Sequence, residues 1–266
     1  MKKHFLQLWC LVFWLYAVPL HAATFDHEHG LLDILLKKHV IMSADKTSSR
    51  VDYQTLAKDR GLMKAYLSAI SSVSQEEFDR WNRKEQLAFL INAYNAYTLD
   101  LVVRHYPVKS VRNIGSFFRK TWSIRFADLL GQKRTLDEIE HGMIRKKGVY
   151  NEPRVHAALV FAAVGSPALR NEVYTAEKLD GQLAQAMSLF LSDRARNRFD
   201  GRLGRFHVSP LFRWKGDDFK AKFGSLGNLF ITYAGALALS EDDVAAIKKE
   251  GTIIEFENFD WSLNDR

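Results

Sequence analysis

Two side chains that nucleophilic catalysis uses, an imidazole and a hydroxyl, lie ten residues apart at His156 and Ser166. His156 belongs to the almost wholly apolar run 155–164, and Ser166 lies in the Gly-Ser-Pro turn that follows it. A buried element that ends in a turn can bring a hydroxyl close to an imidazole base. The chain has no Gly-x-Ser-x-Gly elbow, however, and a satisfied core histidine beside a turn serine is the simpler interpretation.

Glu140 and His141 form a second candidate pair. Glu140 shares the apolar inner face of an expected helix, where a buried carboxylate needs a partner because an unpaired buried charge is costly. Arg154 and Arg170 can supply that partner. A structural ion pair is the favoured interpretation, and the alternative is a general acid or a carboxylate that orients a histidine.

Asn92 and Asn95 lie one helical turn apart in the clearest helical pattern of the chain. Asparagine is disfavoured inside helices, so this spacing predicts specific hydrogen bonds, either to neighbouring backbone or to a ligand. Together with Arg154, these two amides are the candidate substrate-binding residues.

We expect no metal ion and no cofactor. The chain has no Cys-x-x-Cys or His-Glu-x-x-His spacing, and His27-Glu28-His29 is better explained as part of a flexible N-terminal segment. The basic clusters 145–147 and 194–198 are typical of solvated faces.

These candidates must be positioned by a mostly helical chain. Apolar residues at three- and four-residue spacing predict a helix over 83–105 with one buried stripe, ended by Pro107. Further helices are expected over 30–40, 53–70 and 178–191, and after the capping boxes at Ser74 and Thr135. Residues 201–212 predict a hairpin, 252–257 a half-buried strand, and 155–164 a buried strand or helix. The expected fold is α+β, a predominantly helical single domain with a small β-sheet.

The N-terminus predicts export. Lys2 and Lys3 precede an apolar stretch over residues 5–20, and small residues follow at Ala22 and Ala23. This order is typical of a cleaved secretory signal peptide, here residues 1–22, although cleavage after Ala23 and an uncleaved anchor are alternatives. About 16 apolar residues are fewer than a spanning helix prefers. We therefore expect a periplasmic or secreted domain over 23–266, with no transmembrane segment after cleavage.

Cys10 is the only cysteine, and it lies in the predicted signal peptide. The mature protein would have no disulfide, thiol nucleophile or thiolate ligand. The net charge of +7 falls to +5 when Lys2 and Lys3 are removed. Such a mild basic excess suits an envelope polymer or phospholipid headgroups and does not favour nucleic acid.

Several motifs together resemble the bacterial family called domain of unknown function 547 (DUF547). They are Gln86-Leu-Ala-Phe-Leu-Ile-Asn-Ala-Tyr-Asn-Ala-Tyr97, Leu136-Asp-Glu-Ile-Glu-His-Gly142, Pro153-Arg-Val-His156, Tyr174–Asp180, Val208–Trp214 and Asp260-Trp-Ser-Leu-Asn264. The resemblance runs from about Phe25 to Asn264. It implies a signal peptide, which members often carry, and interaction roles in plant relatives fused to coiled-coil regions.

The resemblance also implies a thiol-hydrolase-like site, because members usually have Ala-Leu-Asn-Cys after Arg-x-His and then Ser-Cys-Pro. This chain departs from that pattern, with Val160 and Phe161 in place of Asn and Cys, and Ser166 in place of the Cys before Pro167. Loss of both cysteines and of the neighbouring Asn favours a site kept for binding, because a working switch to serine needs its surroundings preserved.

We therefore expect an exported binding or accessory protein with a degenerate pocket and an unknown protein or envelope component as its partner. The residues expected to line or support the pocket are Asn92, Asn95, Glu140, His141, Arg154, His156 and Ser166. One alternative is a serine-dependent hydrolase or acyltransferase, with Ser166 as nucleophile, His156 or His141 as base and Glu140 orienting it. Another is an envelope-surface interaction module that acts through its basic faces. Whether the protein is an enzyme stays open at this stage.

Overall fold

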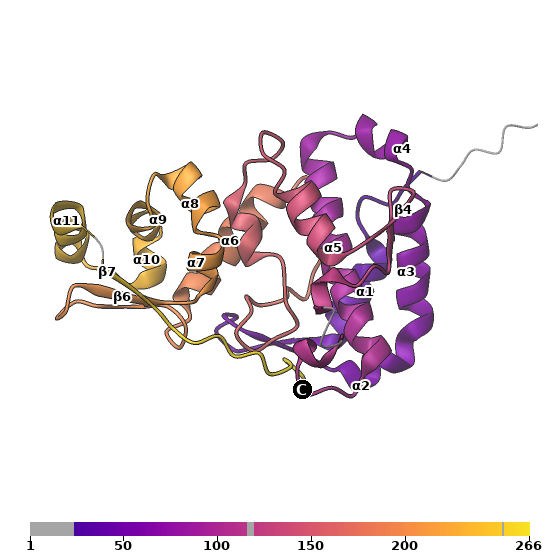
Figure 1. The fold of residues 1–266 in the computed structure, drawn as a ribbon, viewed down its shortest axis with the longest axis horizontal. Helices are drawn as coiled ribbons and strands as arrows, with labels where there is room; N and C mark the ends of the chain where they lie inside the picture. The colour runs from indigo at the N-terminus through magenta and orange to yellow at the C-terminus, as the bar shows by residue number, and fades with distance from the viewer. Residues whose placement is uncertain (1–23, 116–119, 252) are drawn as a thin grey trace, which may run out of the picture.

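One long helix, α5 (Arg83–His105), lies at the centre of the N-terminal half (Figure 1). The computed structural model describes residues 24–115, 120–251 and 253–266, so the predicted signal peptide lies outside the described residues. α5 begins at a capping box in which Asn82 and Glu85 bond each other's backbone N–H groups. Its bounds are those predicted, but every residue from Gln86 to Val103 is buried, not a single stripe. A helix buried on all sides is a core helix.

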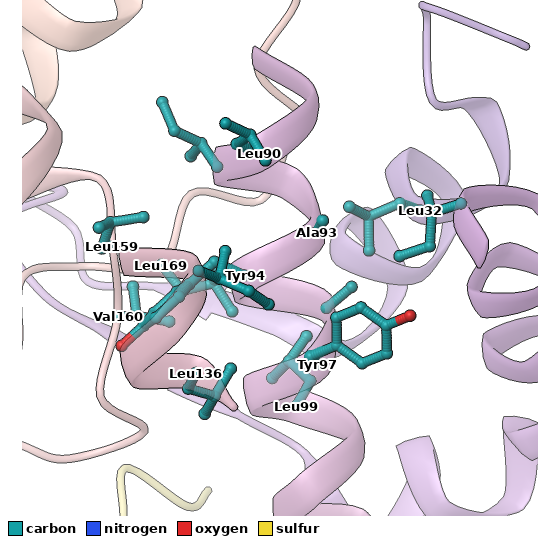
Figure 2. Close-up of a cluster of buried hydrophobic side chains, with 14 of the residues drawn as sticks. Leu32, Leu90, Ala93, Tyr94, Tyr97, Leu99, Leu136, Leu159, Val160 and Leu169 are labelled. Carbon is teal, nitrogen blue, oxygen red and sulfur yellow. The ribbon is translucent and has the colours of Figure 1, made fainter. Parts of the chain in front are cut away.

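Short elements pack around α5 and bury a continuous apolar cluster. The helical elements are α1 (Gly30–His39), α2 (Tyr53–Leu56), η1 (Ala57–Asp59), α3 (Arg60–Ser72), α4 (Gln75–Arg80), η2 (Val111–Asn113), η3 (Thr121–Ser123), η4 (Glu138–Ile144) and η5 (Pro153–Ala157). Figure 2 shows Tyr94 and Tyr97 on α5 among leucines such as Leu32 of α1 and Leu159 of the loop after η5. We call this cluster the N-terminal core.

A second apolar cluster fills the C-terminal half, and we call it the C-terminal core. Its helices are α6 (Leu179–Ser192), α7 (Leu211–Trp214), α8 (Gly216–Phe223), α9 (Leu226–Thr232), α10 (Ala234–Leu237) and α11 (Glu241–Glu250). Aromatic rings dominate it, and Phe212 lies between Phe190, Phe219 and Phe230 at centroid distances of 5.3–5.8 Å. Such tilted and edge-to-face aromatic pairs are favourable arrangements in a core.

The strands form small sheets. β1 (Val40–Met42) pairs with β2 (Ser49–Val51), and β3 (Ala127–Leu129) pairs with β4 (Gln132–Arg134), both antiparallel. β5 (Arg198–Asp200) and β6 (Arg205–Val208) form the predicted hairpin, although the residues after Ser209 enter α7 instead of continuing the strand. β7 (Ile253–Phe256), predicted from its alternation, lies parallel to β6. The mainly helical α+β prediction is confirmed, with several small sheets instead of one.

The apolar run 155–164 is neither of the two elements predicted for it. A short 3₁₀ turn, η5, ends at Ala157, and the residues after it follow an irregular buried path. Periodicity could not reveal this, because a buried loop is apolar just as a buried strand is. Its backbone groups need partners, since an unsatisfied buried amide is costly, and side chains and distant backbone supply them.

The chain end forms a strap over residues 257–266 that returns from the C-terminal half to the N-terminal half. Figure 1 shows it in yellow, running from β7 to the C-terminus beside α2. Val164 and Gly165 donate backbone hydrogen bonds to strap carbonyls at 2.9 Å each. A side chain at position 165 would place its Cβ 2.9 Å from the Asp260 nitrogen, so only glycine fits there. At the far end, the Tyr53 hydroxyl donates to Asn264 at 2.9 Å.

Within the described ranges, no helix is both long enough and apolar enough to cross a membrane.

Candidate functional site

A cluster of charged side chains lies where the N-terminal core meets the C-terminal core. Glu140 comes from the π-helical turn η4 and His156 from η5, and both are almost fully buried. Lys215 and Asp218 come from the start of α8, on the C-terminal side. Charged groups are rarely buried without partners. We call this cluster the charged junction.

Glu140 is paired with Lys215, whose ammonium group donates to Glu140 Oε1. Only 4% of the glutamate side chain and 9% of the lysine side chain are exposed. The predicted structural ion pair is therefore present, but its partner is neither Arg154 nor Arg170. η4 is positioned by the predicted capping box, in which Thr135 and Glu138 bond each other's backbone N–H groups at 2.8 and 3.0 Å.

His156 is fixed by Asp218, whose Oδ2 lies 2.8 Å from His156 Nε2. A carboxylate can only accept, so Nε2 carries the proton of this bond. Burial lowers the pKa of His156, and the imidazole is neutral at pH 7. Arg145 donates from Nε to the same carboxylate oxygen at 2.6 Å. The hydrogen bonds from His156 and Arg145 hold the pKa of Asp218 well below its usual range.

His141 completes the network from a half-exposed position. Its Nδ1 lies 2.6 Å from Arg145 Nη1 and 4.0 Å from Glu140 Oε1. A guanidinium can only donate, so Nδ1 must be the unprotonated ring nitrogen. Partial burial lowers the pKa of His141, and the charges of Lys215 and Arg145 lower it further against the opposing effect of Glu140. A neutral His141 therefore accepts from Arg145.

A pocket of about 510 Å³ opens beside the charged junction, between residues 144–155 and α8. Its cationic lining side chains are Arg145, Lys146, Lys147 and Lys222, and its acidic ones are Glu152, Asp217 and Asp218. Asp218 thus joins the pocket to His156. A hollow of about 290 Å³ at Arg170 and a groove of about 700 Å³ beside α9 and α11 lie away from this network.

Asn92 and Asn95 are buried and both bond loop backbone. The Asn92 amide donates to the Tyr174 carbonyl at 2.7 Å and accepts from the Tyr174 N–H at 3.0 Å. Asn95 makes the same pair of bonds to the buried loop, to the Ala158 carbonyl at 2.9 Å and from the Val160 N–H at 3.1 Å. Of the two predicted roles for these amides, the geometry matches the tying of backbone.

Arg154 is the second residue of η5. It donates to both oxygens of Glu152, at 2.7 and 2.6 Å, and to Asp180 at 2.7 Å. It lines a separate hollow of about 300 Å³ that contains Asp180 but not Asp218. Arg154 is therefore near the charged junction without belonging to it.

Ser166 is buried at the end of the irregular loop. Its hydroxyl accepts from the Phe161 N–H at 3.0 Å, and its carbonyl accepts from Arg196. Among the described residues, no histidine hydrogen-bonds to this hydroxyl, and His156 bonds Asp218 instead. The sequence positions of Phe161 and Ser166, where the resemblance implies two cysteines, are nevertheless brought together.

The histidines near the N-terminus are held firmly and do not form a flexible segment. His29 is buried at the start of α1, and its Nδ1 lies 2.7 Å from the Tyr66 hydroxyl. His27 packs edge-on against Trp81 at a centroid distance of 4.5 Å. In the part of the chain that the structure describes, no three histidine, cysteine or acidic side chains gather as metal ligands would.

Sequence reasoning missed Lys215 and Asp218, and it assigned Arg145 to a solvated basic face. A usable signal was present for the first two. Lys215-Gly-Asp-Asp218 carries three charges and lies between two aromatic residues, Phe212 and Phe219, that are both buried. Charges so close to core residues need partners. Nothing in the basic run 145–147 distinguishes Arg145 from its lysine neighbours.

The fold and junction thus define a mainly helical α+β protein in which a buried histidine is paired with a partly exposed carboxylate at a pocket. The family described as "Protein of unknown function, DUF547" matches residues 78–191, which run from α4 to the end of α6. This match supports the resemblance to that family over these residues. No curated protein and no solved structure matches the chain. The matched region includes Glu140, Arg145 and His156, while Lys215 and Asp218 lie beyond it.

Proposed function

We propose that this is an exported binding or accessory protein, and that its ligand occupies the pocket between residues 144–155 and α8. Asp218 carries the proposal, because it faces this pocket while His156 and Arg145 hold its carboxylate in place. Asp218 in turn restrains Arg145, and polar groups held in this way are suited to recognition, since little conformational entropy is lost when a ligand binds.

The pocket lining supports binding over covalent chemistry that depends on a hydroxyl or thiol nucleophile. Among the described residues, those lining it include no serine, threonine, cysteine or histidine. A nucleophile must lie within hydrogen-bond reach of its base, and Ser166 instead bonds Phe161. The serine-dependent alternative therefore gains no support from the arrangement of these residues.

Export is supported by the order of charge and hydrophobicity at the N-terminus, Lys2-Lys3 followed by the apolar stretch 5–20. N-terminal sequencing of the protein recovered from the periplasm or medium tests it. We expect the mature chain to begin at Ala23 or Thr24. Recovery in the cytoplasm with Met1 retained would overturn this part of the proposal.

The binding role can be tested by filling the pocket. Ala221 is exposed and lines it, so Ala221→Trp occupies the space without changing the core. We expect thermal-shift titrations of the mature protein with phosphate, succinate and glucose to show saturable stabilisation by at least one probe. Ala221→Trp should lose this response, and Ser166→Ala should keep it.

Two results would overturn the binding role. The first is that no probe stabilises the wild type, or that Ala221→Trp responds as the wild type does. The second is covalent labelling by a fluorophosphonate probe that Ser166→Ala abolishes, since this would establish a serine nucleophile.

A further inference from the structure

We propose that the ligand of this pocket is a small oxyanion, a phosphate or carboxylate group, and that the Arg145 guanidinium holds it. This inference rests on the proposed binding function and names the chemical class of its ligand. It depends on how Arg145 is held and on which charges of the pocket already have partners.

Arg145 is fixed along one part of its guanidinium and open at another. Nε donates to Asp218 at 2.6 Å, and Nη1 contacts Nδ1 of neutral His141 at 2.6 Å. Among the described residues, Nη2 has no hydrogen-bond partner, and 21% of the side chain is exposed. Because Arg145 lines the pocket, a restrained and unused pair of N–H donors is presented to a ligand there. Charge-assisted bonds from such a planar group match carboxylate and phosphate oxygens.

Two of the three acidic side chains in the pocket are already neutralised. Asp218 accepts from Arg145 and His156, and Glu152 accepts two bonds from Arg154. Within the described ranges, Asp217 makes no ion pair. It is the one acidic lining side chain that would still repel an anion.

Three cationic side chains of the pocket are not neutralised. Lys146, Lys147 and Lys222 make no ion pair with any described residue. Three lysines against Asp217 leave the pocket with an excess of positive charge. A cleft lined by one sign of charge concentrates ligands of the opposite sign. The other lining residues include Ile144, Pro153 and Val155, so the pocket also accommodates an apolar group attached to the anion.

Isothermal titration calorimetry of the mature wild-type protein tests the inference with three probes: phosphate, succinate and neutral glucose. We expect phosphate or succinate to bind and glucose not to bind. Phosphate binding without succinate binding would identify a phosphate ligand, and the reverse a carboxylate ligand. Failure of both anions to bind at about 10 mM, where even millimolar affinity is detectable, would overturn the inference.

Variants of the pocket locate the anion. Arg145→Gln should weaken binding about ten- to a hundredfold, because a charge-assisted hydrogen-bond donor is lost. Arg145→Lys keeps the charge without the planar group and should bind with intermediate affinity. Lys222→Gln should weaken binding less than Arg145→Gln, and Lys64→Gln, at an exposed position of α3, should have no effect. Circular dichroism confirms that each variant is folded.

The outcomes separate the inference from the function on which it rests. If glucose alone stabilises the wild type and Ala221→Trp abolishes the effect, the pocket binds ligands but the oxyanion assignment is wrong. If an anion binds equally well to Arg145→Gln, it binds elsewhere and the inference is also wrong. If no probe binds, the function and the inference fail together.

Discussion

The N-terminal core and the charged junction satisfy their buried polar groups in different ways. In the N-terminal core, the neutral amides Asn92 and Asn95 of α5 bond the backbone of two buried loops. The ion pair on this helix, Asp100 with Arg104, lies within α5 itself. At the charged junction, ionised side chains are the main partners: Lys215 neutralises Glu140, and Asp218 accepts from Arg145 and His156. The neutral bonds fix the path of the chain, whereas the ionic ones join two parts of the fold and border a pocket. This difference indicates that Asn92 and Asn95 serve the fold alone, whereas the side chains of the charged junction also border the pocket.

The largest effect should come from breaking the buried ion pair. Lys215→Met leaves the Glu140 carboxylate buried without its partner and should lower the free energy of unfolding by about 3–5 kcal/mol. Replacing both residues, as Glu140→Leu with Lys215→Met, should recover most of this loss because no charge is left unpaired. Urea denaturation followed by circular dichroism measures both. If the single variant costs no more than the double variant, the junction is not held by its charges.

A smaller but still large effect is expected for Asn95→Ala. The variant leaves the Ala158 carbonyl and the Val160 N–H without partners, which should cost about 2–4 kcal/mol in unfolding free energy. Thr98→Ala on the same helix is the matched control, because the only hydrogen bond of the Thr98 hydroxyl among the described residues is to the Tyr94 carbonyl of α5 itself. Equal losses in the two variants would contradict a specific role for Asn95 in holding the loop.

The pH dependence of stability should distinguish titrating groups from neutral amides. Burial lowers the pKa of His156, and it lowers the pKa of His29 to about 3. Below the unfolded value of about 6.5, the unfolded chain binds protons that these folded histidines do not. Stability should therefore be constant above pH 6.5 and fall below it, by up to about 1.4 kcal/mol per pH unit for each group. Below about pH 4, Asp218 should add to the loss, because its pKa is lowered by folding.

Variants assign this pH dependence. His156→Gln and His29→Gln should each flatten the decline between pH 6.5 and 5, whatever they cost at pH 7. Asn95→Ala should lower stability by the same amount at each pH, because an amide does not titrate in this range. Urea midpoints between pH 5 and 8 provide the measurement, and an unchanged slope in His156→Gln would show that this imidazole is not held neutral.

The smallest effect should come from an exposed ion pair. Glu76 and Arg80 lie one turn apart on α4, and their side chains are 79% and 69% exposed. Glu76→Gln should leave the urea midpoint unchanged within error, because solvent screens such pairs. A loss comparable to that of Lys215→Met would mean that burial does not separate the junction from surface charges.

Local rules predicted the elements well and their partners poorly. The bounds of α5, the capping residues Ser74 and Thr135 and the strand at β7 follow from spacing and side-chain chemistry within a few residues. The need of Glu140 for a partner was also predictable, because a buried carboxylate requires one. That the partner is Lys215, 75 residues further on, depends on how the two cores meet.

The roles of Asn95 and Ser166 show the same limit. Both had two interpretations, and only the path of the irregular buried loop between them decides what their side chains contact. That path follows from long-range bonds to α5 and to the strap, which no local pattern encodes.

The strap has a consequence for the order in which the fold can form. Tyr53 bonds Asn264 across 211 positions of sequence, and the backbone of Val51 bonds Asn264 as well. A ribosome synthesises residues 24–60 long before residues 257–266, so β2 and α2 cannot complete their native contacts until the strap has been made. Contacts between such distant positions slow folding. During that interval β2 lacks the strap as its neighbour, and the nascent chain is exposed to pairing with other molecules.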